Sequence, residues 1–214
     1  QQSLLECCSF PNFSVVRGDC RDISAIYPLV THSDVIIPLA AITGAPACDK
    51  DRFAAKTTNL LAISDLVNIL SKDQLIIFPN TNSGYGSGKS TEYCTEETSL
   101  NPISVYGRLK CDAEQEVLCH KNSIVFRLAT VFGPSPRMRL DLLVNDFVHR
   151  AMTDGVIVLF EGGFNRNYVH IEDVANAFLF AIEHSEMAVD SVYNLGLDSA
   201  NMTKRELCSI ISRC

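Results

Sequence analysis

The stretch Leu75-Ile76-Ile77-Phe78 decides the fold class. It is short and continuously apolar, and a second run of the same kind, Val35-Ile36-Ile37, lies earlier in the chain. Strands that are apolar at every position are typical of parallel sheets that helices cover on both faces. Outward from these runs, short β-branched or aromatic segments alternate with longer segments of helical periodicity. The pattern predicts an α/β fold with a doubly wound parallel sheet.

The same alternation predicts the individual elements. Strands are expected at residues 13–16, 34–37, 75–78, 124–128, 156–160 and 192–195, and helices near 51–71, 102–120, 140–153, 172–185 and 203–213. The helix near 102–120 can be placed more closely, because Asn101 is a candidate N-cap and Pro102 suits the first helical position. One face of this helix then carries four residues at spacings of four and three: Tyr106, Lys110, Ala113 and Val117.

The composition excludes several classes of protein. The chain has 214 residues, of which 47% are hydrophobic and 20% charged, so it can bury a core without disulfides or metals. With 25 acidic residues against 18 basic ones, no excess of cations is left for a nucleic-acid backbone. No apolar run reaches the roughly 18 to 20 residues that span a bilayer, and Gln1–Glu6 lack the features of a signal peptide. We therefore expect a cytoplasmic protein with no nucleic-acid partner and no membrane partner.

The nine cysteines predict no metal or redox site. They are odd in number and include no Cys-x-x-Cys pair, which leaves a zinc ribbon or a redox motif without support. Cys7 and Cys8 are adjacent, but adjacent side chains on a helix point apart. We expect most of the cysteines to be small buried hydrophobic residues.

Tyr106 and Lys110 form the pair with the clearest chemical use. They lie one helical turn apart, so their side chains can interact. A free tyrosine has a pKa of about 10, and a nearby cation favours the phenolate and moves that pKa toward the working range of a base. The spacing alone is weak support, because surface helices often contain it by chance. Thr81, however, directly follows an apolar strand, at the edge where open α/β sheets bind ligands.

These residues resemble a motif of the extended short-chain dehydrogenase/reductase family, the NAD-dependent nucleotide-sugar epimerases and dehydratases. In that family a strand ends in Ser or Thr a few residues before Tyr-Gly, and Asn-Pro and Tyr-x-x-x-Lys follow. Further motifs are similar and occur in the family's order, so that the resemblance covers essentially the whole chain: Gly18–Asp22 (GDCRD), Val35–Ala41 (VIIPLAA), Phe126–Pro134 (FRLATVFGP), Arg166–Val174 (RNYVHIEDV) and Tyr193–Gly196 (YNLG).

The resemblance implies a set of site residues. The catalytic residues it implies are Thr81, Tyr106 and Lys110. The residues it implies for NAD, with NADP also possible, are Asp19, Cys20, Leu39, Ala40, Ala41, Asn59, Asn80, Tyr106 and Lys110. For a nucleotide-diphosphate sugar it implies Asn82, Ser83, Thr130, Asn145 and Arg166. In the family, the Asp carboxylate contacts the adenine amino group, the arginine binds the diphosphate, and an Asn stands where this chain has Thr130.

The chain also departs from the family pattern. The first strand, the Gly-x-x-Gly-x-x-Gly turn and the helix that receives the pyrophosphate are not in this sequence. We therefore expect part of a longer enzyme, in which residues 1–130 form a Rossmann-like cofactor-binding core that lacks the first β-α-β unit. Residues 131–214 would form a smaller substrate-binding portion with a returning strand at 192–195. These residues alone should bind NAD far more weakly than the longer enzyme.

Three features of the sequence suggest alternative interpretations. The segment Gly84–Ser90 is similar to a Walker A loop, but Ser83 stands where the first glycine is needed. His170 is better explained by structural hydrogen bonds than as a general base. A catalytically silent NAD-binding regulatory protein is the third alternative, and the presence of Thr81, Tyr106 and Lys110 together argues against it.

Within the family, the residues after Thr81 bear on the reaction. Dehydratases carry an acidic residue there, whereas this chain has Asn82 and Ser83, which do not exchange protons near neutral pH. Epimerisation of a nucleotide sugar through a transient keto-sugar is therefore favoured, with a dehydratase or a reductase as the alternative. Tyr106 as phenolate would remove a hydroxyl proton while a hydride passes to the nicotinamide. Lys110 would hold the phenolate and the ribose, and Thr81 would bind the reacting oxygen. The family also implies a homodimer.

Overall fold

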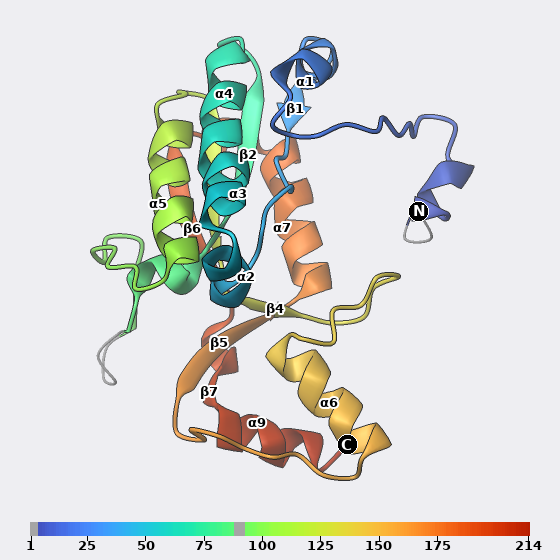
Figure 1. The fold of residues 1–214 in the computed structure, drawn as a ribbon, viewed down its shortest axis with the longest axis vertical. Helices are drawn as coiled ribbons and strands as arrows, with labels where there is room; N and C mark the ends of the chain where they lie inside the picture. The colour runs from blue at the N-terminus through green and yellow to red at the C-terminus, as the bar shows by residue number, and fades with distance from the viewer. Residues whose placement is uncertain (1–3, 88–92) are drawn as a thin grey trace. The chain divides into compact units, whose positions relative to one another are not determined.

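The computed structural model describes residues 4–87 and 93–214, and the chain divides into two compact units (Figure 1). The large unit contains residues 18–128 and 177–195, and the small unit contains the residues up to 17 together with 129–176 and 196–214. Residues 177–195 thus return to the large unit, whereas the sequence-based division groups them with the substrate-binding portion. The assignment of a cofactor-binding domain and a substrate-binding domain stays a prediction.

A four-stranded parallel sheet forms the centre of the large unit. Its strands, in spatial order, are β1 (Val35–Ile36), β2 (Leu75–Thr81), β3 (Ser123–Leu128) and β6 (Ser191–Leu195). Every neighbouring pair is parallel, and the register places Phe78 opposite Val125 and Leu128 opposite Leu195. The predicted α/β fold with a parallel, Rossmann-like sheet is confirmed.

Helices cover both faces of this sheet. Ile76 and Phe78 pack with one layer, and Ile77 and Ile124 pack with the other. The first layer contains α1 (Ile23–Val30), α4 (Ala62–Ile69) and α5 (Val105–Leu118), and the second contains α7 (Ile171–Glu183). In Figure 1, α4 and α5 lie side by side. All four strand side chains are fully buried, and each such burial contributes about 1.5–3 kcal/mol.

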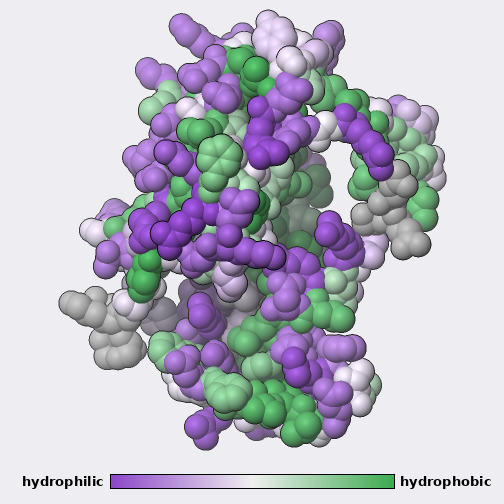
Figure 2. All heavy atoms as spheres, in the orientation of Figure 1, coloured by the Kyte–Doolittle hydropathy of each residue, from purple (hydrophilic) through white to green (hydrophobic). Residues whose placement is uncertain are grey.

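The outer surface of the first layer differs from its buried side. Hydrophilic and hydrophobic residues are intermixed over α3, α4 and α5 in Figure 2. A nearly continuous helical segment joins β1 to β2, built from α2 (Ala45–Lys50), α3 (Arg52–Lys56), a π-type turn η3 (Thr57–Leu61) and α4. Asp51 accepts the backbone N–H of Ala54 at 2.8 Å and so caps α3.

Helix α5 begins later than the sequence predicts. Ser104 is its N-cap, because the serine side chain accepts the backbone N–H of Gly107 at 3.0 Å. Asn101 instead donates its backbone N–H to the C=O of Gly84 at 2.9 Å, and Pro102 lies outside the helix. The predicted N-cap and first helical position are therefore wrong, since a contact with the turn η4 (Asn82–Tyr85) holds this segment outside the helix.

The small unit contains a three-stranded sheet and two longer helices. The strand order is β4 (Thr130–Phe132), β5 (Asn165–His170) and β7 (Asn201–Thr203), with β4–β5 parallel and β5–β7 antiparallel. Helices α6 (Leu143–Thr153) and α9 (Lys204–Ile211) enclose a core of Val144, Phe147, Tyr168 and Leu207. A capping box between Thr203 and Glu206 begins α9. The short elements are η2 (Cys7–Ser9), α8 (Ser185–Ala188) and η5 (Asp198–Ala200).

Two predicted strands are absent from the described residues. Residues 13–16 pair with no other strand, and Val15 and Val16 are exposed. In residues 156–160 the alternation is real, because Ile157 and Leu159 pack on the core of the small unit, but no neighbouring strand bonds to them. An apolar alternation thus predicts a buried side without ensuring a hydrogen-bonding partner. Strands β4, β5 and β7 are not among the predicted ones, since they are short or begin with polar residues.

The expectation that most cysteines are buried is also wrong. Cys48 and Cys111 are buried, and the other seven are half-buried or exposed. All nine are free thiols. Many lie in turns or at helix ends, such as Cys119 at the end of α5, where a small side chain reaches solvent.

The described ranges, 4–87 and 93–214, contain neither a metal-binding cluster nor a membrane-spanning helix. No group of three His, Cys, Asp or Glu side chains there could hold a metal ion. None of the helices in these ranges combines the length and the apolar character that crossing a membrane requires.

Candidate functional site

Thr81 ends strand β2 and begins the turn η4. Its hydroxyl oxygen accepts the backbone N–H of Ser83 at 3.1 Å and donates to the Ser83 hydroxyl at 3.0 Å. Thr81 is half-buried. The turn continues to Gly86, whose φ of +73° suits glycine, and an added Cβ would lie 2.2 Å from the backbone oxygen of Asn101. The close approach of these two backbone segments fixes the loop that follows Thr81.

Lys110 is the most unusual charged residue of the predicted site. It is 4% exposed, and its Nζ donates to the C=O of Pro79 at 2.7 Å, two residues before Thr81. The ammonium also lies 3.8 Å from the centre of the Phe78 ring. Burial lowers the pKa of Lys110 to about 7, although the negative charge of Glu114 opposes this shift.

Tyr106 lies one turn before Lys110 on the same face of α5. Its ring is half-buried and packs with a cluster formed by Cys48, Ala55 and Leu109. Tyr106 and Lys110 share one helix face, and Lys110 is bonded to the strand that ends in Thr81.

A buried carboxylate lies one turn after Lys110. Glu114 is 0% exposed, and Arg127 on β3 donates to it through Nη2 at 2.6 Å and through Nε at 3.1 Å. The Nδ2 of Asn80 on β2 donates to the same carboxylate. Removing one partner of such a buried pair costs about 3–5 kcal/mol, because it leaves an uncompensated charge.

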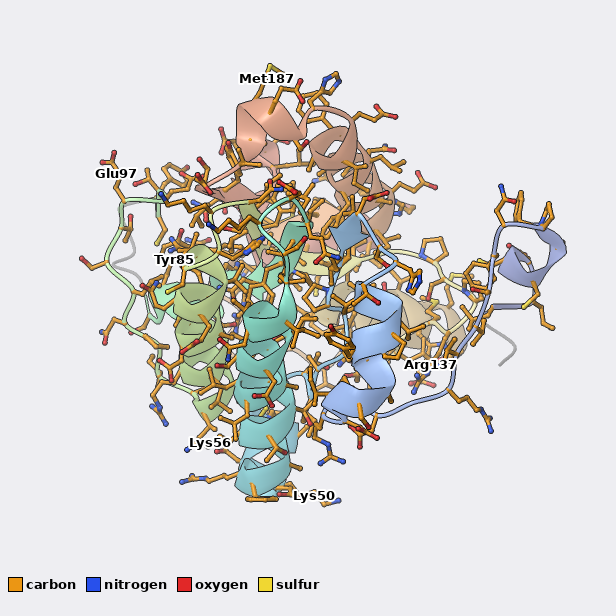
Figure 3. All side chains as sticks on the ribbon, turned by 90° about the horizontal axis from the view of Figure 1, so that it is seen from above. Lys50, Lys56, Tyr85, Glu97, Arg137 and Met187 are labelled. Atoms are coloured by element: carbon orange, nitrogen blue, oxygen red, sulfur yellow. The ribbon has the colours of Figure 1, made fainter. Side chains whose placement is uncertain are left out.

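The network continues from Arg127 to other segments. Its Nη1 donates to the Tyr85 hydroxyl at 2.9 Å and to the backbone oxygen of Glu96 at 3.1 Å. The Tyr85 hydroxyl donates to Oδ1 of Asn194 on β6 at 2.6 Å. Tyr85, which is labelled in Figure 3, belongs to the η4 turn that contacts α5. One chain of hydrogen bonds therefore joins α5, three strands and the segment before α5.

The pKa shifts inside this network have clear causes. Burial opposes the charge of Arg127, but its hydrogen bonds with Glu114 and Tyr85 outweigh that effect and raise its pKa. Burial, together with the charge of Glu114, raises the pKa of the Cys111 thiol to about 11. Burial also raises the pKa of the Tyr85 phenol, which Arg127 counteracts. The phenol and the thiol are therefore kept neutral, and the charge resides on the pair Glu114–Arg127.

Asn59, predicted to contact the cofactor, holds a loop in this structure. It is 1% exposed, and its amide pairs with both backbone groups of Ile42 at 2.8 Å. The π-type turn η3 carries this side chain. Asn59 therefore fixes the segment that follows β1, which contains the predicted residues Leu39, Ala40 and Ala41.

Three of the residues predicted to contact the cofactor are exposed or half-buried: Asp19, Cys20 and Leu39. The carboxylate of Asp19 pairs with the side chain of Arg21 at 2.6 Å, and this hydrogen bond lowers the pKa of Asp19 to about 2. Cys20, the next residue, is half-buried, and its burial raises the pKa of its thiol. Leu39 is 73% exposed, in the irregular segment after β1.

The predicted substrate residues lie in both units. Asn82 and Ser83 belong to η4 in the large unit, whereas Thr130 on β4, Asn145 on α6 and Arg166 on β5 belong to the small unit. Arg166 is exposed. Asn145 is buried. Its amide accepts the N–H of Gly133 and donates to the backbone oxygen of residue 139, each at 3.1 Å.

The structure describes His170 fully, but it describes only part of the segment similar to a Walker A loop. His170 accepts the backbone N–H of Glu172 at 3.4 Å and packs edge-on against Phe132, so it has structural contacts as expected. The segment similar to a Walker A loop, Gly84–Ser90, ends in residues that lie outside the described ranges.

The comparison with protein families identifies the chain. The family described as "NAD dependent epimerase/dehydratase family" matches residues 4–196. The chain belongs to this family. Family membership agrees with the predicted resemblance, and the family is named for its dependence on NAD.

The proteins similar to this chain include one described as a dehydratase and one described as an epimerase. A dTDP-D-glucose 4,6-dehydratase of Dictyostelium discoideum is 25% identical over 207 residues, which are 87% of this chain and 47% of that protein. A protein of Bacillus subtilis (strain 168), described as an uncharacterized UDP-glucose epimerase, is 28% identical over 187 residues, which are 82% of this chain and 57% of that protein. The chain thus spans about half the length of these relatives.

Solved structures of the family share the fold. The UDP-glucuronic acid 4-epimerase from Bacillus cereus, in complex with UDP-glucuronic acid and NAD, matches with a TM-score of 0.86 at 22% identity, over 98% of this chain and 68% of that one. The dTDP-glucose 4,6-dehydratase from Bacillus anthracis, in complex with NAD, matches with a TM-score of 0.83 at 22% identity, over 99% and 66%.

The buried network around Glu114 is not predicted by the sequence. Glu114, Tyr85 and Asn194 are not among the predicted site residues, and Arg127 appears only within a motif. One signal was available for Glu114, since it lies four residues after Lys110, on the helix face that also carries Ala113 and Val117. A charge on an apolar helix face requires a buried partner.

Proposed function

We propose that this chain provides the catalytic residues of an NAD-dependent nucleotide-sugar epimerase. The observation that carries the proposal is the placement of Lys110. Its ammonium is buried one helical turn after Tyr106 and bonded to the backbone of β2 just before Thr81. A buried cation at that place can stabilise a phenolate, which water would otherwise have to solvate.

Each member of the trio has a distinct role. Tyr106 acts as the base that takes the proton of a sugar hydroxyl, and later returns it. Lys110 holds the phenolate by its charge. Thr81 presents its hydroxyl to the reacting oxygen and shares the charge that develops there.

The residues present are compatible with the adenine of NAD and with one of its riboses. The exposed carboxylate of Asp19 can accept from an adenine amino group, and the small side chains of Ala40 and Ala41 leave the backbone after β1 open to approach. Lys110 supplies a donor for a ribose hydroxyl. When bound, NAD would accept a hydride from the sugar carbon and return it. NADP is the alternative cofactor.

The choice of epimerisation rests on the residues that follow Thr81. Asn82 and Ser83 carry an amide and a hydroxyl, and neither can act as the acid or base that eliminates water near neutral pH. Dehydration and reduction are the alternative reactions. Arg166 and Thr130 would bind the nucleotide diphosphate and the sugar, with Arg166 supplying a planar cation for the phosphates.

The variant Tyr106→Phe in the whole protein tests the proposal. We expect the rate of epimerisation to fall by at least about 10²-fold, because the proton acceptor is lost, while NAD affinity changes little. UDP-glucose and UDP-glucuronic acid are the first substrates, and proton NMR distinguishes a 4-epimer from a 4-keto-6-deoxy product. Tyr93→Phe is the matched control, since Tyr93 is 79% exposed. A Tyr106→Phe rate within threefold of the wild type would contradict the assignment.

We also propose a cytoplasmic homodimer, by resemblance to the family. Size-exclusion chromatography with light scattering tests the assembly. A monomer at micromolar concentration would contradict it.

A further inference from the structure

The carboxylate of Glu114 joins three elements of the large unit. Glu114 lies on α5, and Arg127 on β3 donates to both of its oxygens. Asn80 on β2, the strand next to β3, also donates to this carboxylate. Glu114 is 0% exposed, and none of the roles assigned above uses it.

Two consecutive turns of α5 are bonded to two consecutive residues of β2. Lys110 donates to the C=O of Pro79 at 2.7 Å, and Glu114, one turn later, accepts from Asn80. A turn of α-helix advances about 5.4 Å, so a slide or a rotation of α5 would break both contacts. The next residue of β2 is Thr81. The double contact therefore sets where Lys110 lies relative to Thr81.

Stability alone does not explain this arrangement. A buried ion pair adds little net stability, because the cost of removing both charges from water offsets their attraction. In addition, Oδ1 of Asn80 is buried without a hydrogen-bond partner among the described residues, and an unpaired buried acceptor is unfavourable. Apolar side chains of similar size would hold these elements together at lower cost. The polar arrangement supplies orientation and charge instead.

We propose that Glu114 is a positioning residue, which holds α5 in register with β2 through Asn80 and Arg127 and supports the positive charge of Lys110. The inference rests on the proposed function, which assigns Tyr106 and Lys110 their roles. The ionisable groups packed around this part of α5 are Tyr106, Cys111 and Glu114 on the helix, Arg127 on β3, Tyr85 in η4 and Cys48 on α2. Glu114 supplies the negative charge among them.

The first test compares Glu114→Gln with the control Glu116→Gln in the whole protein. Glu116 lies on the same helix and is exposed. Glu114→Gln should lower kcat by about 10- to 100-fold, since small displacements of reacting groups have effects of this size, while KM stays within about threefold. The alkaline limb of the pH–rate profile should move down by about one pH unit, because Lys110 loses the negative charge that supports its protonated form.

The double variant Glu114→Leu/Arg127→Met separates positioning from stability. It removes both charges and keeps an apolar filling, but the buried Asn80 amide loses its acceptor, so its unfolding temperature should lie closer to that of the wild type than the temperature of either single variant does. We expect kcat to stay about tenfold or more below the wild type. Wild-type kcat in a well-folded double variant would overturn the proposal. So would an unchanged pH profile in Glu114→Gln.

Failure of this inference can be told from failure of the proposed function. If Tyr106→Phe abolishes turnover and Glu114→Gln has the activity of Glu116→Gln, only the positioning role is wrong. The titration of Lys110, followed through its Cε chemical shift in labelled protein, needs no turnover. It should show a lower midpoint in Glu114→Gln than in the wild type, and an equal midpoint would overturn the inference independently of the reaction.

Discussion

Replacing Lys110 by methionine tests the electrostatics of the site without an assay of turnover. Burial lowers the pKa of Lys110 from 10.5 to about 7, so the folded protein holds this charge at a cost. Methionine is similar in length and carries no charge, and it can keep the packing against Phe78. We therefore expect Lys110→Met to be more stable than the wild type at acidic pH, with the advantage shrinking as the pH rises.

The sign follows from proton binding in the two states. Below pH 7 both the folded and the unfolded chain bind the proton of Lys110, and the full cost of burying the charge is present. Between pH 7 and the ordinary value of 10.5, the unfolded chain retains a proton that the folded chain has released. Folding stability therefore rises with pH across this window.

The magnitude follows from the size of the pKa shift. The fall from 10.5 to about 7 corresponds to about 5 kcal/mol, at about 1.36 kcal/mol for each pH unit. Between pH 6 and pH 9 the contribution of Lys110 changes by about 2.5–3 kcal/mol. The hydrogen bond to Pro79 and the contact with Phe78 return about 1–3 kcal/mol. The net advantage of the variant at pH 6 is thus about 2–4 kcal/mol.

Urea denaturation followed by circular dichroism at pH 6 and pH 9 measures this difference. The free energy of unfolding of Lys110→Met, relative to the wild type, should fall by about 2.5–3 kcal/mol from the lower to the higher pH. Lys56→Met is the control, because Lys56 is exposed on α3, and its relative stability should not change with pH. A pH-independent difference for Lys110→Met would show that the folded lysine keeps its ordinary pKa, and would refute the reasoning.

Two further changes test how the site is supported. Asn59→Ala should destabilise the protein by about 2–4 kcal/mol in thermal or urea unfolding, because it removes both hydrogen bonds to the loop after β1 and leaves backbone groups unpaired. Asn68→Ala, at an exposed position of the neighbouring α4, is its control, and equal effects of the two would contradict the holding role. Gly86→Ala should cost more than about 2 kcal/mol, because the glycine has a φ of +73° and its Cβ would meet the backbone of Asn101. Gly163→Ala is the control, since nothing lies within 4 Å of its added Cβ, and similar unfolding midpoints for both would show that the turn after Thr81 can relax.

The class of fold and the shared helix face of Tyr106 and Lys110 follow from the sequence alone. The runs at Val35–Ile37 and Leu75–Phe78 are apolar at every position, so both faces of each strand must be buried. The local pattern therefore predicts a sheet with helices on both faces. The spacing of Tyr106 and Lys110 likewise fixes their shared helix face, because the helical period does not depend on distant residues.

The partners of these elements depend on contacts between segments that are distant in the sequence. The chain at 13–16 has the composition of a strand, but a strand needs a neighbour to bond with, and a sequence pattern does not supply one. Asn101 and Pro102 have the composition of a helix start, but a contact with Gly84 holds them outside α5. Local preferences of this size yield to a single long-range hydrogen bond.

The same holds for the charges of the site. In the sequence, Glu114 is one charged residue on a predicted helix. Its burial depends on donors from β2 and β3, which are distant in sequence. The low pKa of Lys110 depends equally on which segments exclude water from it. Sequence spacing can place two groups on one helix face. Desolvation and the pairing of buried charges depend on everything that surrounds them, and so they are decided only when the whole chain has packed.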